Sequence, residues 1–195
     1  MAKQRSAFTI IEVLIVMAII LVLAGLILAT SGYVQNKGRR SRAEAEIAAI
    51  SAAMENYKAD NGIYPRDPTT TDALAADVDP GGGDPGTFVD SSKFLYKSLS
   101  GDSDGDPTTS TSTDTKNYFG AALKPNMLSP NPPAAGTFIR DPFGYSYGYS
   151  TIKAAAPTGA NGYNPTYDLW STGGETAKKS SETFATYQQR WIKNW

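Results

Sequence analysis

The sequence predicts an α+β protein. One long N-terminal helix, with a membrane half and an amphipathic half, packs on a small C-terminal antiparallel β-sheet with long loops. Three observations predict this class: an apolar run near the N-terminus, a helical apolar stripe after it, and aromatic residues alternating with small ones near the C-terminus. We divide the chain into a short N-terminal segment (1–7), a transmembrane helix (8–34), a basic collar with an amphipathic helix (35–60), a variable loop-rich region (61–136) and a β-sheet region (137–195).

The apolar run extends from Val13 to Ala29, 17 consecutive apolar or small residues. With residues 8–11 before it and 33–34 after it, the segment exceeds the ~20 helical residues that span a bilayer core of ~30 Å. It is too long for the apolar part of a secretory signal peptide, and it lacks a small-x-small cleavage site followed by a polar mature start. We therefore predict a membrane-spanning helix.

Glu12 interrupts this apolar stretch. A charged side chain at the centre of a membrane helix costs about 2.5–3.5 kcal/mol on insertion scales, and less near the helix end. Glu12 either snorkels to the interface or meets a positive partner within the membrane. The run contains no Lys or Arg, so that partner would have to be a free α-amine created by cleavage nearby.

A helical stripe continues the predicted helix beyond the membrane. Its members recur at spacings of four, three, four and three residues: Ala43, Ile47, Ile50, Met54 and Tyr57. We expect this face to pack on the sheet, because the alternative of a coiled coil has only two heptads to support it. Asn61-Gly62 ends the pattern, and Pro65 follows. The helix is therefore expected from Phe8 to Asp60.

The strand signals lie in the C-terminal third. The clearest is an alternation of aromatic residues with Gly and Ser: Phe143, Tyr145, Tyr147 and Tyr149. Residues 167–170 form a second candidate strand, and 137–140 a shorter one before a turn at Asp141-Pro142. Residues 93–99 fit either a helix or a strand. An aromatic ladder can bind sugars, but it more often forms the half-buried face of a sheet, which we expect here.

Composition limits the chemistry. The chain has no Cys and no His, which excludes disulfides, Cys–His and Ser–His nucleophiles and the usual zinc sites. We expect no enzyme. Four cations follow the apolar run, Lys37, Arg39, Arg40 and Arg42, while residues 43–195 carry 12 basic and 18 acidic residues. A basic cluster can bind nucleic acid, but beside a membrane segment it more often meets lipid phosphates, so we expect no nucleic acid.

Five segments resemble a known family. Residues 3–20, KQRSAFTIIEVLIVMAII, resemble the N-terminal signature of type IV pilins and type II secretion pseudopilins. Four more resemble segments of the major (G-type) pseudopilins: NGIYPRD at 61–67, DPFGYSYGY at 141–149, YDLWSTGG at 167–174 and IKNW at 192–195. The resemblance covers residues 1–66 and 138–195, with a long divergent insertion between them. It implies a pilin-like fold.

The resemblance also implies processing and assembly roles. A prepilin peptidase would remove residues 1–7 by cutting between Ala7 and Phe8, and would then N-methylate Phe8. Ala7 stands where the family prefers Gly. Glu12 falls on the family's Glu, which pairs with the N-terminal amine of a neighbouring subunit during assembly. That pairing removes two charges from lipid at once.

The implied function is that of a structural subunit of a periplasmic pseudopilus, which polymerises through its N-terminal helix to drive type II protein secretion. The chain would form a homo-oligomeric helical filament and contact membrane lipid, minor pseudopilins, an inner-membrane assembly platform and the peptidase. It would cross the bacterial inner membrane once, with its head in the periplasm. The positive-inside rule alone would instead place the collar in the cytoplasm.

Two alternatives remain. One is a type IV pilus subunit for adhesion, motility or DNA uptake; the absence of Cys weighs against it, since many such pilins close a C-terminal loop with a disulfide. The other is an enzyme or binding domain on an uncleaved anchor, against which the absence of His, Cys and any nucleophile motif weighs. Asp168 is interpreted as a turn or cap residue rather than a catalytic one.

Ca²⁺ is the one cofactor that the sequence suggests. Asp102, Asp104 and Asp106 form a D-x-D-x-D run whose carboxylates can converge on Ca²⁺; the alternative is a solvated acidic loop.

The resemblance implies a different calcium site, at the Leu169 carbonyl, Ser171 and an acidic pair downstream. That pair is missing here, so that only Glu175 or Glu182 could contribute.

Overall fold

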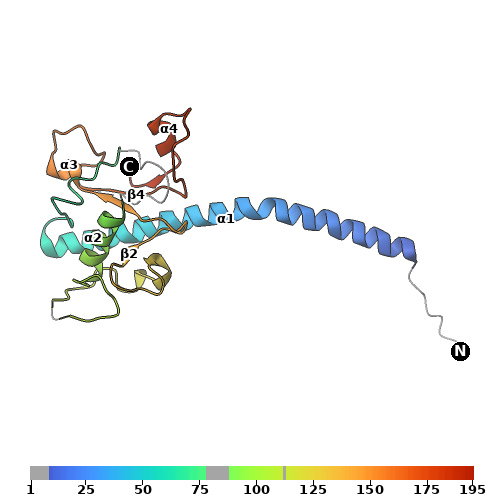
Figure 1. Cartoon of the computed structure of the whole chain (residues 1–195), viewed down its shortest axis with the longest axis horizontal. Coiled ribbons are helices and arrows are strands. Elements are labelled where there is room, and N and C mark those ends of the chain that lie inside the picture. The colour runs from blue at the N-terminus through green and yellow to red at the C-terminus, as the bar shows by residue number, and fades with distance from the viewer. Residues whose placement is uncertain (1–8, 78–87, 112) are drawn as a thin grey trace. The chain divides into compact units, whose positions relative to one another are not determined.

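The computed structural model describes residues 9–77, 88–111 and 113–195. Helix α1 (Ile10–Asn61) is 52 residues long (Figure 1). The chain divides into two compact units, residues 1–38 and residues 39–195, and the second is called the head below. The predicted α+β class with a long N-terminal helix is confirmed.

Within the head, the predicted stripe of α1 is the face that enters the core. Ala43, Ile50 and Met54 are fully buried, and Ile47 is 6% exposed. The helix ends as its sequence indicates: Gly62 adopts a left-handed φ of 79°, and its N–H donates to the Lys58 carbonyl at 2.7 Å. The observed end at Asn61 lies one residue beyond the predicted one.

The remaining elements are short. The strands are β1 (Leu128–Ser129), β2 (Phe138–Ile139), β3 (Gly148–Ser150), β4 (Asp168–Ser171) and β5 (Ile192–Lys193). The helices are α2 (Val89–Ser100), α3 (Ile152–Ala155) and α4 (Phe184–Gln188), with 3-10 turns η2 (Gly120–Ala122) and η3 (Pro125–Met127).

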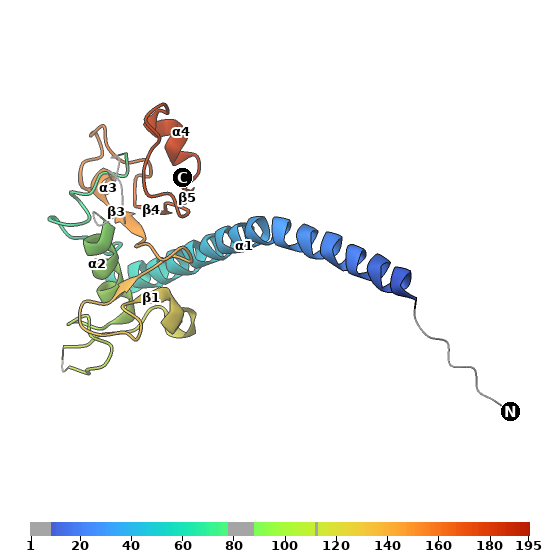
Figure 2. The same cartoon turned by 45° about the vertical axis from the view of Figure 1, so that its right-hand side comes forward.

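The strands form two antiparallel sheets rather than the single expected one, β1-β2 and β3-β4-β5. In the larger sheet Tyr149 lies opposite Leu169, and Ser171 lies opposite Ile192. Helix α2 packs on β2 and β3 and so links the two sheets. Figures 1 and 2 both show it beside the C-terminal part of α1.

The predicted strand over residues 143–149 is wrong for its first half. The Asp141 side chain accepts hydrogen bonds from the N–H groups of Phe143 and Tyr145, both at 2.9 Å. These bonds hold the backbone in the turn that Asp141-Pro142 predicted, so strand pairing begins only later. Tyr147 and Tyr149 are nevertheless fully buried, as a sheet face requires.

Two apolar clusters stabilise the head. The larger joins the α1 stripe to α2 and to Tyr147, Tyr149 and Leu169. The smaller is aromatic, and in it the rings of Trp170 and Trp191 stack 6.1 Å apart. The larger cluster fixes the C-terminal strands to α1, whereas the smaller one joins β4 and the C-terminal segment to Ala76 and Phe88.

Candidate functional site: the N-terminal helix and the loops of the head

The apolar part of α1 is exposed along its length. Its large side chains from Ile10 to Val34 expose half or more of their surface, for example Val13 at 50% and Leu28 at 77%. By length and composition, α1 is the one helix in the described residues that could cross a membrane. Aliphatic side chains exposed on this scale require lipid or another apolar surface to cover them.

Glu12 lies in the first turn of this helix and forms a capping box with Thr9. Its Oε2 accepts hydrogen bonds from the Thr9 backbone N–H and the Thr9 hydroxyl, both at 2.8 Å. The Glu12 N–H donates to the Thr9 hydroxyl oxygen at 3.3 Å. These reciprocal bonds satisfy donors that a helix start leaves unpaired. Thr9 is a residue of this site that we did not predict, although the Thr-x-x-Glu spacing indicates a capping box.

The processing residues Ala7 and Phe8, with the rest of the leader, lie outside the described residues. The cleavage and methylation sites therefore stay predictions, as does the pairing of Glu12 with a neighbour's amine.

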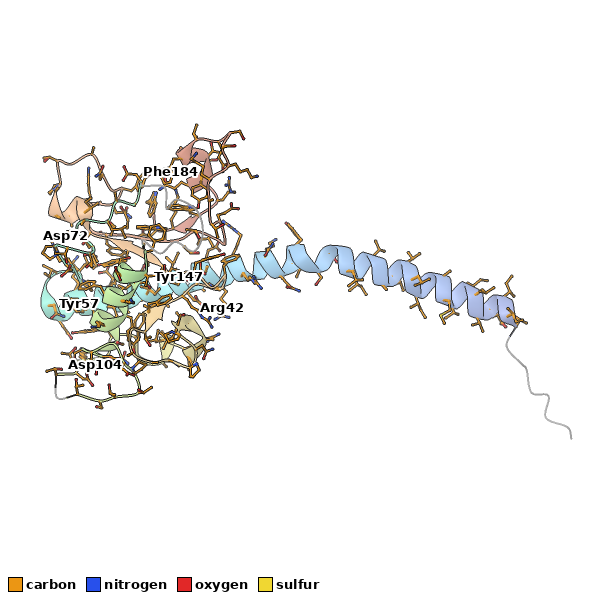
Figure 3. All side chains as sticks on the ribbon, in the orientation of Figure 1. Arg42, Tyr57, Asp72, Asp104, Tyr147 and Phe184 are labelled. Atoms are coloured by element: carbon orange, nitrogen blue, oxygen red, sulfur yellow. The ribbon has the colours of Figure 1, made fainter. Side chains whose placement is uncertain are left out.

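Two collar arginines are bonded within the head. Arg40 Nη1 donates to the Arg190 carbonyl at 2.8 Å, and Arg42 Nε pairs with Glu46 at 2.7 Å (Figure 3 labels Arg42). Arg39 makes no hydrogen bond or ion pair with any residue that the structure describes. Arg40 and Arg42 thus make contacts within the head, while Arg39 retains exposed positive charge.

The segments that carried the family resemblance meet in the head. The Tyr149 hydroxyl donates to the Pro65 carbonyl at 2.5 Å, which joins the second and third motifs. Asn194 of the terminal motif accepts from the Leu169 N–H at 2.9 Å and donates to the Tyr167 carbonyl at 3.3 Å. Motif segments as far as 84 residues apart in the sequence are therefore bonded to one another in the head.

Asp168, the first residue of β4, has the capping role interpreted from the sequence. Its carboxylate accepts from the N–H groups of Tyr163 and Asn164, each at 2.8 Å, and burial raises its pKa. Both carboxylate oxygens are used to close the loop before β4.

The Asp-rich loop satisfies its own carboxylates. Asp102 accepts from the Tyr96 hydroxyl and the Gly105 N–H, each at 2.8 Å. Asp104 accepts from the Asp106 N–H at 2.9 Å, and Asp106 from the Thr108 hydroxyl at 2.6 Å. These are local turns rather than a convergent set. In the described part of the chain, no three acidic side chains gather in a way that could hold a metal ion.

Leu169 and Ser171, the ligands that the resemblance suggested, also have protein partners. The Leu169 carbonyl accepts from the Asn194 N–H at 3.2 Å, and the Ser171 hydroxyl donates to Asp141 Oδ2 at 2.5 Å. Figure 3 shows Asp104, in the Asp-rich loop, on the opposite side of the head from Phe184, the first residue of α4. A calcium site at either group stays a prediction; Ca²⁺ takes six to eight oxygen ligands, and the oxygens named here already accept or donate hydrogen bonds within the chain.

Comparisons with known proteins agree with the motifs. Residues 2–28 match the family model of the prokaryotic N-terminal methylation motif. The chain is 35% identical over 72 residues to the type II secretion system core protein G of Pseudomonas aeruginosa, across 37% of this chain and 51% of the relative. For the protein of the same name in Aeromonas hydrophila the identity is 33% over 72 residues, across 37% and 50%. For that of Vibrio cholerae it is 31% over 74 residues, across 38% and 49%.

The chain thus spans about half the length of the curated relatives it matches. No solved structure matches it. The N-terminal motif and these relatives support the resemblance to major pseudopilins, and with it a pilin-like fold.

Proposed function

We propose that this chain is a structural subunit of a periplasmic pseudopilus, which polymerises through α1 and serves type II protein secretion. The N-terminal methylation motif and the relatives named as core protein G support this role. They are secretion components rather than enzymes, and we propose a structural rather than a catalytic role here. The chain would be held in the bacterial inner membrane by α1, with its head in the periplasm.

The observation that carries the proposal is the exposed apolar length of α1 with a carboxylate at its start. Ile10 is 83% exposed and Leu21 is 73% exposed. Lipid covers such a surface before assembly, and the same surface of neighbouring subunits covers it within a filament. Because an unpaired carboxylate is unfavourable in lipid, a subunit that brings an amine to Glu12 is favoured over one docked out of register.

The proposed partners follow from this arrangement. Copies of the chain form the filament, and minor pseudopilins with an inner-membrane assembly platform begin and extend it. A prepilin peptidase creates the amine at Phe8. Exposed cations of the collar, Arg39 among them, contact lipid phosphates.

The experiment compares Glu12→Gln with Glu12→Ala. Gln also serves in a capping box, so Glu12→Gln keeps the Thr9 contacts and removes only the charge. We expect both variants to insert in the membrane normally but to form few filaments, measured by sedimentation and electron microscopy, and not to restore secretion to a deletion strain. Glu44→Gln, an exposed carboxylate on the same helix, is the control and should behave as wild type.

Two outcomes would redirect the proposal. If Glu12→Gln formed as many filaments as the wild type, the role of Glu12 would be limited to capping the start of α1. Normal secretion in the deletion strain, with loss of adhesion, motility or DNA uptake, would favour the alternative of a type IV pilus subunit.

A further inference from the structure

A cluster of two carboxylates around one guanidinium closes the loop that follows β4. Arg190 Nη1 donates to Glu182 Oε2 at 2.7 Å, and Arg190 Nη2 donates to Glu182 Oε1 at 2.8 Å. On the other side, Arg190 Nε lies 3.2 Å from Glu175 Oε1, and Nη2 donates to Glu175 Oε2 at 3.3 Å. The Arg190 side chain therefore bonds to the loop at two places, Glu175 and Glu182.

This cluster is part of the packed head rather than a loose surface pair. The Glu182 side chain is 11% exposed and that of Arg190 is 31% exposed. The Tyr187 ring lies 5.4 Å from the guanidinium, and the Tyr187 hydroxyl donates to the Glu175 carbonyl at 3.2 Å. The Arg190 carbonyl in turn accepts from Arg40 of α1, so the loop is connected to the helix.

The single positive charge of Arg190 is shared between two carboxylates, so the three side chains together keep one formal negative charge. Hydrogen bonds from Arg190 are the main cause that lowers the pKa of Glu182 to about 2, so this carboxylate is ionised at neutral pH. A planar guanidinium fits a carboxylate through two parallel N–H bonds, a geometry that a spherical ion does not need. Both acids that could contribute to a calcium site after Ser171 are thus already paired with this guanidinium.

The cluster occupies the part of the head where a calcium site was expected. It lies in the loop that begins directly after Ser171, where the resemblance suggested metal ligands. A divalent ion placed between Glu175 and Glu182 would face the positive charge of Arg190, and Ca²⁺ needs more oxygen ligands than two carboxylates supply. The Leu169 carbonyl and the Ser171 hydroxyl, the other suggested ligands, are engaged by Asn194 and Asp141.

We propose that Arg190 is an internal cation that closes the 172–183 loop in place of a metal ion, so that the head is stable without Ca²⁺. The proposal concerns the folded head alone and is independent of filament assembly or secretion.

The test uses the full chain in detergent micelles. Its three Trp residues, Trp170, Trp191 and Trp195, all lie in the head, so their fluorescence follows unfolding of the head. We expect the wild-type melting midpoint to be the same in EGTA as in millimolar CaCl₂. A lower midpoint in EGTA would overturn the proposal without any mutation.

Variants test the role of the guanidinium itself. Arg190→Gln should lower the melting midpoint by about 2–4 °C. Arg190→Lys keeps the charge but loses the paired bonds, so its midpoint should lie between those of the wild type and Arg190→Gln. Lys178 and Lys179 lie in the loop, so a lysine-specific protease reports its closure. Cleavage there should be slow in wild type with or without Ca²⁺ and at least several-fold faster in Arg190→Gln.

A matched control removes a cation from an exposed pair. Lys93 lies 3.8 Å from Asp90, and Lys93→Gln should change neither the midpoint nor cleavage of the loop. The proposal fails if Arg190→Gln resembles Lys93→Gln, or if Ca²⁺ slows loop cleavage in the wild type.

Discussion

The Tyr147 hydroxyl donates a hydrogen bond of 2.8 Å to Glu46 Oε2, and both side chains are buried. The bond joins the segment just before β3 to the face of α1 that enters the core. Glu46 also pairs with Arg42, so the carboxylate has two partners inside the head. Burial, with the charge of Glu46, raises the pKa of Tyr147, so the hydroxyl remains a donor at neutral pH.

Tyr147→Phe should therefore destabilise the head. The change leaves a buried carboxylate short of one donor, which costs about 1.5–3 kcal/mol for a hydrogen bond to a charged group. Chemical denaturation followed by Trp fluorescence measures the loss. Tyr118→Phe is the control, because its hydroxyl bonds only to the exposed side chains of Asn61 and Asp60 among the described residues, so the variant should lose far less. Equal stabilities for the two variants would contradict this role of Tyr147.

Gly148→Ala should also destabilise the head, by overpacking. A Cβ at Gly148 would lie 2.1 Å from Trp170 Cε2, and β3 is fixed to β4 by its pairing there. Overpacking of this kind costs about 1–3 kcal/mol.

The control for this variant is Gly38→Ala, whose Cβ meets nothing within 4 Å. It should not destabilise, since Ala favours a helix over Gly. Unchanged denaturation of Gly148→Ala would show that the Trp170 ring can move aside.

Asp67 should make stability depend on acid pH. Its carboxylate accepts four bonds from Thr69 and Thr70, and these lower its pKa to about 2 from the ordinary 3.8. Because the folded pKa lies below the unfolded one, the contribution is complete above pH 3.8 and is lost as pH falls toward 2. The stability gap between wild type and Asp67→Ala should therefore close over this range. A gap that stays constant down to pH 2 would show that the ionised form is not what the turn requires.

Much of the fold followed from local patterns. The stripe on α1 and the helix stop at Gly62 are properties of neighbouring residues, and the structure confirms both. Strand β4 was predicted because its apolar and aromatic residues stand between turn signals. Residues 93–99, whose sequence fitted either a helix or a strand, are part of helix α2. The local sequence does not decide between these two structures. The packing of α2 against β2 and β3 is a long-range effect.

The remaining features depend on partners distant in sequence. Asp141 diverts the first half of the aromatic ladder into a turn, and its other oxygen accepts from Ser171, thirty residues away. Arg190 bonds to Glu182, eight residues away, and to Glu175, fifteen residues away, with α4 between Arg190 and both acids in the sequence. Among local patterns, the Thr9–Glu12 capping box was overlooked because Glu12 was considered only as a charge in lipid.

The most direct test of the central claim is mass spectrometry of the N-terminus of the protein purified from its native membrane. The account predicts a chain that begins at Phe8 with a methylated amine, since only a cleaved chain presents the amine that Glu12 needs. A chain that still begins at Met1 or Ala2 would contradict it.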